Sequence, residues 1–253
     1  MVKMETSGFC RLARAYHSLE TLAFGDTLQC ARVACLSLLV DAEKILILGE
    51  GDGRFLRALL AANPSCGVTV VDRSPAMLAL ARRRLSPVQQ DRVDFRLEDV
   101  IRLDFQSEAF DAVVTHFFLD CFRGDTLSAL MPKVAASLRS GGQWLLADFV
   151  EPLGEGVGAS LRRFALRVLY AFFRTTCGIE GQHVVNPGDL MRAAGFREIR
   201  RKVFLGDWVV SLAWEKVSVP VMPAAGSLEW PSGNQKALTT PRPRALNTSP
   251  LSR

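Results

Sequence analysis

The sequence has few of the residues from which metal and redox sites are built. Its 253 residues include three histidines, and its six cysteines show no C-x-x-C spacing. Zinc sites are typically made of closely spaced cysteine pairs with histidines nearby, so we expect no metal centre. Scattered cysteines are typical of reduced thiols, and we therefore expect a cytoplasmic protein.

Long apolar runs and clustered positive charge are also missing. No stretch reaches the roughly 18 uncharged apolar residues of a membrane-spanning helix, and we identify no signal peptide near the N-terminus. The net charge is +5, of which +3 lies in residues 218–253, so the rest of the chain carries only +2. Such a small excess gives no reason to expect a nucleic-acid partner.

The composition changes near residue 217. Six of the twelve prolines lie between Pro220 and Pro250, among serine, threonine and asparagine. A segment of this kind buries too little apolar surface to offset the entropy lost on ordering, so we predict a disordered tail over 217–253. We divide the rest into an N-terminal helical segment over 1–40 and one folded domain over 41–216, with a substrate-side insertion at about 151–185.

Within the folded domain, short apolar runs alternate with helix-length segments. Helices are predicted over 52–62, from Pro75 onwards after the cap residue Ser74, and over 126–138 with a stop at Ser140-Gly141-Gly142. Parallel strands are predicted at 44–48, 67–71, 93–97, 111–115 and 144–149. A helix that starts near Pro187 and ends at Gly195 is followed by a hairpin of 198–204 and 208–214. The pattern predicts an α/β, Rossmann-like doubly wound sheet, mostly parallel with an antiparallel terminal hairpin strand and with helices on both faces.

The stretch ILILGEGDG places three glycines between the first strand and the first helix. Gly49, Gly51 and Gly53 lie where ligands bind in open α/β sheets. The third glycine of a dinucleotide fingerprint would fall at Arg54, so that pattern is incomplete. The acids Glu50 and Asp52 would repel a pyrophosphate and tolerate a cationic ligand.

Two further carboxylates follow the next strands. Asp72 ends the second strand, where it can accept hydrogen bonds from ribose hydroxyls, and Asp99 follows the third, where it can accept from an adenine amine. Together with the glycine loop they describe a pocket for an adenosine. S-adenosylmethionine contains an adenosine, which matches the pocket. It also carries a sulfonium and an ammonium and no phosphate, which matches the acidic loop.

These motifs resemble those of the class I S-adenosylmethionine-dependent methyltransferases. ILILGEGDG is similar to the first motif of the family, VVDRSPAML to its ribose motif and LEDV to its adenine motif. FDAVVTHFFLDCF and LRSGGQWLLADF match its fourth and fifth strand segments. Upstream, RLARAYHSLETLAFG resembles the lid helix of small-molecule members of the ubiquinone and menaquinone type. One position departs from the pattern, because Ile47 stands where the family often has an acid that helps hold the methionine ammonium.

The resemblance implies a role for each candidate residue. It implies that Tyr16 closes over the cofactor and that Gly49, Gly51 and Gly53 line the methionine part. Because Ile47 is not an acid, the contact with the ammonium falls to Glu50, Asp52 or backbone carbonyls, or is not made. It further implies that Asp72 binds the ribose and that Arg73 and Met77 contact the faces of the adenine. Asp99 and the Val100 amide would bind the adenine edge.

Methyl transfer from a sulfonium needs alignment more than acid–base groups, because the leaving group is already activated. His116 follows the fourth strand and is the best candidate for a general base, with a wall residue as the alternative. Asp120 would orient an acceptor or cap the next helix. Three arginines recur at helical spacing in the substrate region, namely Arg163, Arg167 and Arg174. They would form a solvated helix face, a cationic wall that binds an anionic acceptor, or a surface that contacts anionic lipid.

The sequence thus predicts a methyltransferase that uses S-adenosylmethionine and a small-molecule acceptor of hydrophobic or anionic character. Two alternatives stay open. The first is an NAD(P)-binding oxidoreductase, which Arg54 and the terminal hairpin disfavour. The second is a non-catalytic S-adenosylmethionine-binding protein, which Ile47 keeps open.

Overall fold

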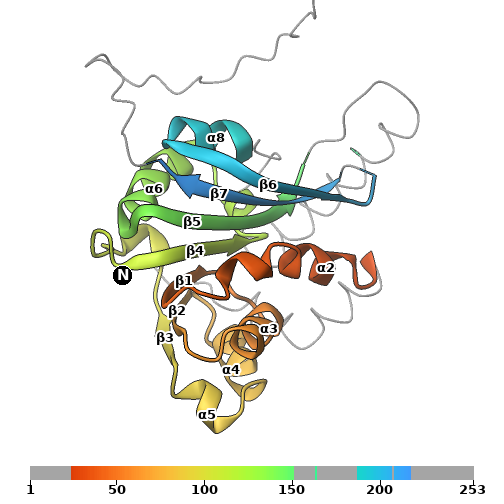
Figure 1. Cartoon of the computed structure of the whole chain (residues 1–253), viewed down its shortest axis with the longest axis vertical. Coiled ribbons are helices and arrows are strands. Elements are labelled where there is room, and N and C mark those ends of the chain that lie inside the picture. Colours follow the sequence, from red (N-terminus) through yellow and green to blue (C-terminus); the bar gives the residue numbers. More distant parts are fainter. Residues whose placement is uncertain (1–23, 151–162, 164–186, 207, 218–253) are drawn as a thin grey trace, which may run out of the picture. The chain divides into compact units, whose positions relative to one another are not determined.

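A computed structural model of the chain describes residues 24–150, 163, 187–206 and 208–217. Its seven strands form one sheet in the order β3-β2-β1-β4-β5-β7-β6 (Figure 1). The strands are β1 (Lys44–Leu48), β2 (Gly67–Asp72), β3 (Val93–Leu97), β4 (Phe110–His116), β5 (Leu138–Phe149), β6 (Phe196–Phe204) and β7 (Val209–Lys216). The α-helices are α2 (Thr27–Val33), α3 (Arg54–Ala62), α4 (Pro75–Arg83), α5 (Pro87–Gln90), α6 (Gly124–Ser137) and α8 (Pro187–Ala193). Short 3₁₀ helices are η1 (Leu36–Leu39), η2 (Val100–Arg102) and η3 (Leu119–Cys121).

The predicted fold class is confirmed. Strands β1 to β5 pair in parallel, and β7 pairs antiparallel with both β5 and β6. The hairpin therefore inserts its second strand, β7, between β5 and β6, which makes β6 an edge strand. Strand order reverses direction at β1, where β2 lies on one side and β4 on the other, and such a switch point creates a crevice at the carboxyl ends of the strands.

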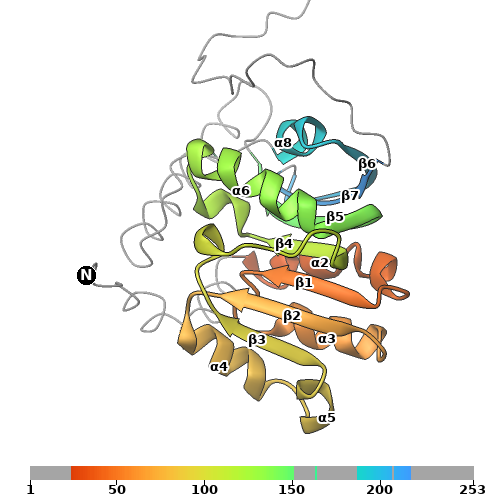
Figure 2. The same ribbon diagram turned by 90° about the vertical axis from the view of Figure 1, so that its left-hand side faces the viewer.

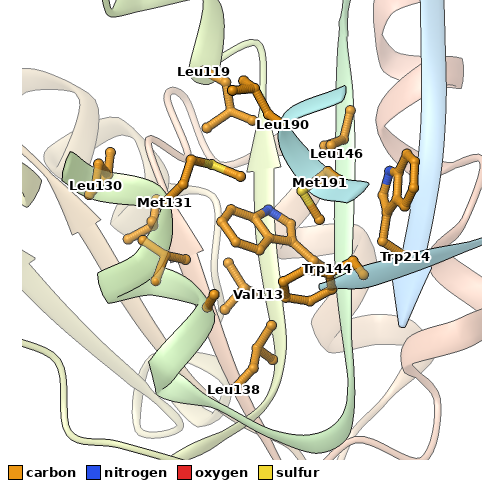
Figure 3. Packing of buried hydrophobic residues seen from close by; sticks show 14 of the residues in the cluster. Val113, Leu119, Leu130, Met131, Leu138, Trp144, Leu146, Leu190, Met191 and Trp214 are labelled. Atoms are coloured by element: carbon orange, nitrogen blue, oxygen red, sulfur yellow. The ribbon is translucent and has the colours of Figure 1, made fainter. Parts of the chain in front are cut away.

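Helices cover both faces of the sheet and define two apolar layers (Figure 2). On one face, α3 contributes Leu56, Leu59 and Leu60 to a core with Ile45 and Val114. On the other face, α6 and α8 pack over a core that surrounds Trp144 (Figure 3). The alternating residues of β1 are buried on both faces, which explains why its sequence is an unbroken apolar run.

Trp144 is one of two fully buried tryptophans in this second core, the other being Trp214. Its ring lies edge-on to Phe196 of β6, with centroids 5.6 Å apart, and its indole N–H donates to the Thr115 hydroxyl over 2.9 Å. A single side chain thus connects β5 with β4 and β6. Because the indole donor has a partner, this burial carries no desolvation penalty for an unpaired group.

Two local predictions have different outcomes. The Ser74 cap is confirmed, because its hydroxyl accepts the Met77 N–H at the start of α4 and Pro75 occupies the first helical position. The helix stop at Ser140-Gly141-Gly142 is wrong. Helix α6 ends at Ser137 and β5 starts at once, with a register shift against β4 between the pairs Phe110↔Leu138 and Ala112↔Gln143. Gly141, at φ +71°, therefore lies where the pairing of β4 and β5 is irregular, and it does not end a helix.

Candidate cofactor cleft

A cleft of about 1030 Å³, partly open to solvent, lies at the carboxyl ends of β1, β2 and β4. Most of the residues predicted from sequence meet there. Its lining includes Gly49, Glu50, Gly51, Asp72, Arg73, Met77, Asp99, Val100 and His116. Tyr16 lies outside the described residues, as do Arg167 and Arg174.

The three loop glycines serve three different purposes. All have positive φ, between +70° and +87°, which favours glycine. A Cβ on Gly49 would lie 2.2 Å from the Phe118 ring, whereas a Cβ on Gly51 would meet nothing within 4 Å. Gly51 thus has open space above it, as the approach of a ligand requires.

Gly53 is not among the residues that line the cleft. A Cβ there would lie 2.5 Å from the Cα of Ala81, so Gly53 allows the start of α3 to approach α4. The role in lining the methionine part that the family resemblance implied for it stays a prediction. Gly53 is also the N-cap of α3.

Glu50 belongs to the glycine loop, and its side chain contacts the start of α3. Its carboxyl accepts the Leu56 N–H over 2.8 Å and so satisfies one of the donors left over at the helix start. Burial raises the pKa of Glu50 to about 8, against the opposing effects of that hydrogen bond and of nearby Arg32. At neutral pH Glu50 is therefore mostly protonated in the free protein, and a cation beside it would favour ionisation.

Asp52 also lines the cleft but is already neutralised by the protein. Its carboxylate pairs with Arg54 over 3.1 Å and with Arg84 over 2.7 Å, and Arg84 also donates to the Asp52 carbonyl. The sequence argument counted both loop acids as free negative charge. That argument needs correction, because only Glu50 is left to respond to a cationic ligand.

Asp72 and Asp99 are held by backbone donors. Asp72 accepts the Ser74 N–H over 2.8 Å and the Gly51 N–H over 3.3 Å, one on each oxygen, and burial raises its pKa against these hydrogen bonds. Asp99 accepts the Ile101 N–H over 3.1 Å at the start of η2. Each carboxylate oxygen keeps a lone pair in fixed orientation, which is what recognition of ribose hydroxyls and an adenine amine requires.

His116 ends β4 and is a neutral wall of the cleft. Burial, assisted by nearby Arg32, lowers its pKa to about 3, and its ring lies edge-on to Phe55 with centroids 4.5 Å apart. A group with so low a pKa is a weak general base at neutral pH, which favours the wall alternative. Its Nδ1 is buried and has no hydrogen-bond partner among the described residues.

Several lining residues carried no recognisable signal in the sequence. Arg32 comes from α2, and an aromatic wall comes from the segment after β4, namely Phe117, Phe118 and Phe122 with Cys121 between them. The aromatic run HFFLDCF was visible, but nothing in it indicated which rings face the cleft. No neighbouring residue in the sequence identified Arg32 as a cleft residue, because it reaches the cleft only through the packing of α2.

A pair of carboxyl groups lies beside this wall. Asp148 of β5 is hydrogen-bonded to Asp120 of η3, and its pKa is raised well above the usual value by burial and then by the Asp120 charge. Asp120 also accepts from the Cys121 thiol over 3.6 Å. The predicted cap role of Asp120 is not seen, because α6 starts at Gly124 with Arg123 as its N-cap.

Within the described ranges, no group of three or more histidine, cysteine or acidic side chains has an arrangement that could hold a metal ion. No helix in that same part of the chain is long and apolar enough to cross a membrane. The four cysteines it contains are free thiols.

The sheet order, the antiparallel β7 and the acidic cleft define a Rossmann-like domain of the methyltransferase type. The family model described as a methyltransferase domain matches residues 45–142. The chain is 32% identical to the demethylmenaquinone methyltransferase of Thermus thermophilus, over 64% of this chain and 73% of that one. It is also 32% identical to the enzyme of that name from Tropheryma whipplei, over 57% and 58% of the two chains. It thus spans little more than half the length of that relative.

Solved structures share the fold at lower identity. The Burkholderia thailandensis 1,6-didemethyltoxoflavin-N1-methyltransferase, solved with that molecule and S-adenosylhomocysteine, aligns with a TM-score of 0.59 at 20% identity, over 84% of this chain and 87% of that one. The chain belongs to the class I S-adenosylmethionine-dependent methyltransferases, whose cofactor is S-adenosylmethionine.

The residues of the cleft fit that cofactor. Open space above Gly51 and two oriented carboxylates belong to the same cleft, which His116 also lines. Ile47, at the position where the family often has an acid, is buried in the core beneath α3. Glu50 supplies an acid at the cleft instead.

Proposed function

We propose that the protein transfers a methyl group from S-adenosylmethionine to a small-molecule acceptor. The observation that carries the proposal is the order of groups along the sheet edge. Asp99, Asp72 and Glu50 follow the neighbouring strands β3, β2 and β1 and line one cleft. This order matches the adenine, ribose and cationic amino-acid parts of one extended ligand.

The cofactor would supply an activated methyl group on its sulfonium, and the chain has to bind, align and shield it. Asp72 would fix the ribose, and Asp99 with the Val100 amide the adenine. The phenylalanines after β4 exclude water from the reacting end, which strengthens electrostatic interactions there. An acceptor that needs no strong base agrees with the weak basicity of His116.

We infer a hydrophobic acceptor from the aromatic wall and from the quinone-type relatives. A cytoplasmic location is supported by the four free thiols. Contact with membranes through Arg163, Arg167 and Arg174 stays a prediction, as do the domain boundaries and the absence of a nucleic-acid partner. The non-catalytic alternative is decided by an activity measurement.

The test is calorimetric titration of the full chain with S-adenosylmethionine, S-adenosylhomocysteine and NADH, followed by methyl transfer to a panel of quinone-like acceptors. We expect micromolar binding of the first two ligands and none of NADH. Binding without transfer to any acceptor would favour the non-catalytic alternative. Absence of binding would refute the proposal.

A substitution at Asp72 tests the site itself. Asp72→Asn should weaken S-adenosylmethionine binding by about 1–3 kcal/mol, because a charge-assisted hydrogen bond to the ribose is lost. Asp91→Asn, at an exposed position outside the cleft, is the matched control and should leave the affinity unchanged. Equal affinities for the wild type and Asp72→Asn would remove Asp72 from the site.

A further inference from the structure

The aromatic wall of the cleft belongs to segment 117–122, which lies outside the strands of the sheet. The pairing of β4 with β5 ends one residue before this segment, at His116 and Ala147. Inside the segment, the N–H groups of Cys121 and Phe122 donate to carbonyls three residues earlier, which is the pattern of a 3₁₀ turn. A single turn of this kind has little stability of its own, so the position of the wall depends on contacts with the rest of the domain.

Two polar contacts connect segment 117–122 with β5. At its start, the Phe117 N–H donates to the Ala147 carbonyl over 2.7 Å. Further along, the Asp148 carboxyl of β5 is hydrogen-bonded to the side chain of Asp120 and accepts the Asp120 N–H. The Phe149 N–H donates to the same carboxyl over 2.9 Å and so orients it from the strand. The second contact depends on the Asp148 side chain, and it can therefore be changed by substitution.

The two carboxyl groups are buried behind the wall. Asp148 is 3% exposed and Asp120 is 8% exposed, and neither is among the residues that line the cleft. Two ionised carboxylates at hydrogen-bond distance would repel each other, whereas one shared proton makes a short and strong O–H···O contact between them. The pair is therefore placed to hold the wall rather than to contact a ligand.

Cys121 connects the carboxyl pair with the cleft. Its thiol donates to Asp120 over 3.6 Å, and its side chain lines the cleft. Burial, followed by the charges of Asp120 and Asp148, raises the pKa of this thiol, while the charge of Arg73 acts in the opposite direction. A thiol with a raised pKa reacts slowly with alkylating reagents. Cys121 thus reports, from the wall itself, whether the segment is in place.

We propose that Asp148 is a positioning residue for methyl transfer, because through Asp120 it holds segment 117–122 against β5 and keeps the aromatic wall in place along the cleft. The inference rests on the proposed function, in which this wall excludes water from the reacting end. Loss of the contact lets the wall move, so that methyl transfer slows while the adenosine contacts of Asp72 and Asp99 on other strands remain.

Alkylation of the chain's own thiols tests the position of the wall. The full-length variants Asp148→Ala and Asp148→Asn are treated with N-ethylmaleimide at about pH 7.5, and labelling of each cysteine is followed by peptide mass spectrometry. Alanine removes the partner of Asp120, whereas asparagine keeps an oxygen that accepts and an amide that donates. Both substitutions remove the same charge beside the thiol. We expect Cys121 to react at least about tenfold faster in Asp148→Ala than in Asp148→Asn.

Two other thiols distinguish movement of the wall from unfolding of the domain. Cys35 and Cys66 are completely buried, so they are labelled when the domain itself opens. We expect their labelling to be equal in the two variants, with the difference confined to Cys121. Should Asp148→Ala fail to fold, Asp120→Ala and Asp120→Asn give the same comparison from the other side of the contact.

A kinetic comparison tests the consequence for methyl transfer. With an acceptor from the quinone-like panel, Asp148→Ala should lower kcat by at least about tenfold, with a Kd for S-adenosylmethionine within about threefold of the wild type. Asp148→Asn should restore most of the loss in kcat. Equal kcat values for the two variants would overturn the role in methyl transfer.

The labelling separates this inference from the proposed function, because it needs neither cofactor nor acceptor. Equal labelling of Cys121 in the two Asp148 variants, or a rise shared by Cys35 and Cys66, would overturn the positioning role and leave the proposed function standing. Absence of S-adenosylmethionine binding to the wild type would overturn the proposed function, and with it the role of Asp148 in methyl transfer, whatever the labelling shows.

Discussion

At the scale of single residues, the two acids of the glycine loop have separate tasks although only one residue lies between them. Asp52 is held by two arginines and stabilises the loop against α4 through Arg84. Glu50 faces the cleft with a pKa raised to about 8 by burial. We therefore expect Glu50 to respond to a cationic ligand, and we expect the response to involve a proton.

Cofactor affinity should consequently depend on pH through Glu50. A carboxyl with a pKa of about 8 is protonated below that pH, while a sulfonium ligand favours the carboxylate, so binding releases a proton. We expect the affinity to rise roughly fivefold between pH 6.5 and 7.5, because ionisation of Glu50 increases about eightfold while the α-amine of the ligand, with a pKa of about 8, loses part of its charge. Calorimetry in buffers of different ionisation enthalpy measures the released proton.

Glu50→Gln is the matched variant, because its amide oxygen can still accept the Leu56 N–H. It should bind more weakly than the wild type at pH 7.5 and show no pH dependence over this window. An unchanged slope in Glu50→Gln would assign the proton to another group.

At the scale of elements, the approach of α3 to α4 depends on a residue without a side chain. Gly53 caps α3 at φ +87°, with the backbone of Ala81 directly beside it. The contact fixes the start of α3 under the loop and thereby the position of Glu50, which binds the Leu56 N–H of that helix. The geometry of the glycine loop therefore depends on the packing of α3 against α4.

Comparison of Gly53→Ala with Gly51→Ala tests this packing role. Both substitutions place a Cβ at positive φ, which costs about 1–2 kcal/mol, but only Gly53→Ala also collides with a backbone. We expect the free energy of unfolding to fall by about 1–2 kcal/mol for Gly51→Ala and by at least about 1–3 kcal/mol more for Gly53→Ala. Urea denaturation provides both values, and equal losses would contradict the packing role.

At the scale of the whole molecule, the central sheet buries a pair of carboxyl groups between β5 and the segment after β4. Asp148 and Asp120 are both less than 9% exposed and are hydrogen-bonded to each other, which requires a shared proton. The folded chain therefore keeps this proton to a higher pH than the unfolded chain, whose Asp pKa is about 3.9.

This proton makes stability depend on pH with a definite sign. The pKa of Asp148 is raised in the folded state, so its contribution is fully present below the unfolded pKa of about 4 and is lost as pH rises toward the folded pKa. We expect Asp148→Asn to flatten this loss, so that its melting temperature exceeds that of the wild type increasingly as the pH rises above about 4. Scanning calorimetry over that range provides the comparison.

Asp104→Asn, at a side chain that is 95% exposed, is the control and should follow the wild-type pH curve. Parallel curves for the wild type and Asp148→Asn would show that the pair shares no proton in the folded chain.

The strands, the Ser74 cap and the terminal hairpin could be predicted from the sequence, because apolar periodicity and capping act over a few residues. It also identified Asp72, Asp99 and the glycine loop, since the ends of neighbouring parallel strands must meet at one edge. The remaining features could not be predicted, because they depend on how the elements pack. The entry of Arg32 into the cleft, the neutralisation of Asp52 and the packing role of Gly53 depend on contacts between elements that are distant or unrelated in sequence. The charge state of Glu50 depends on burial, which a linear pattern of residue types does not specify.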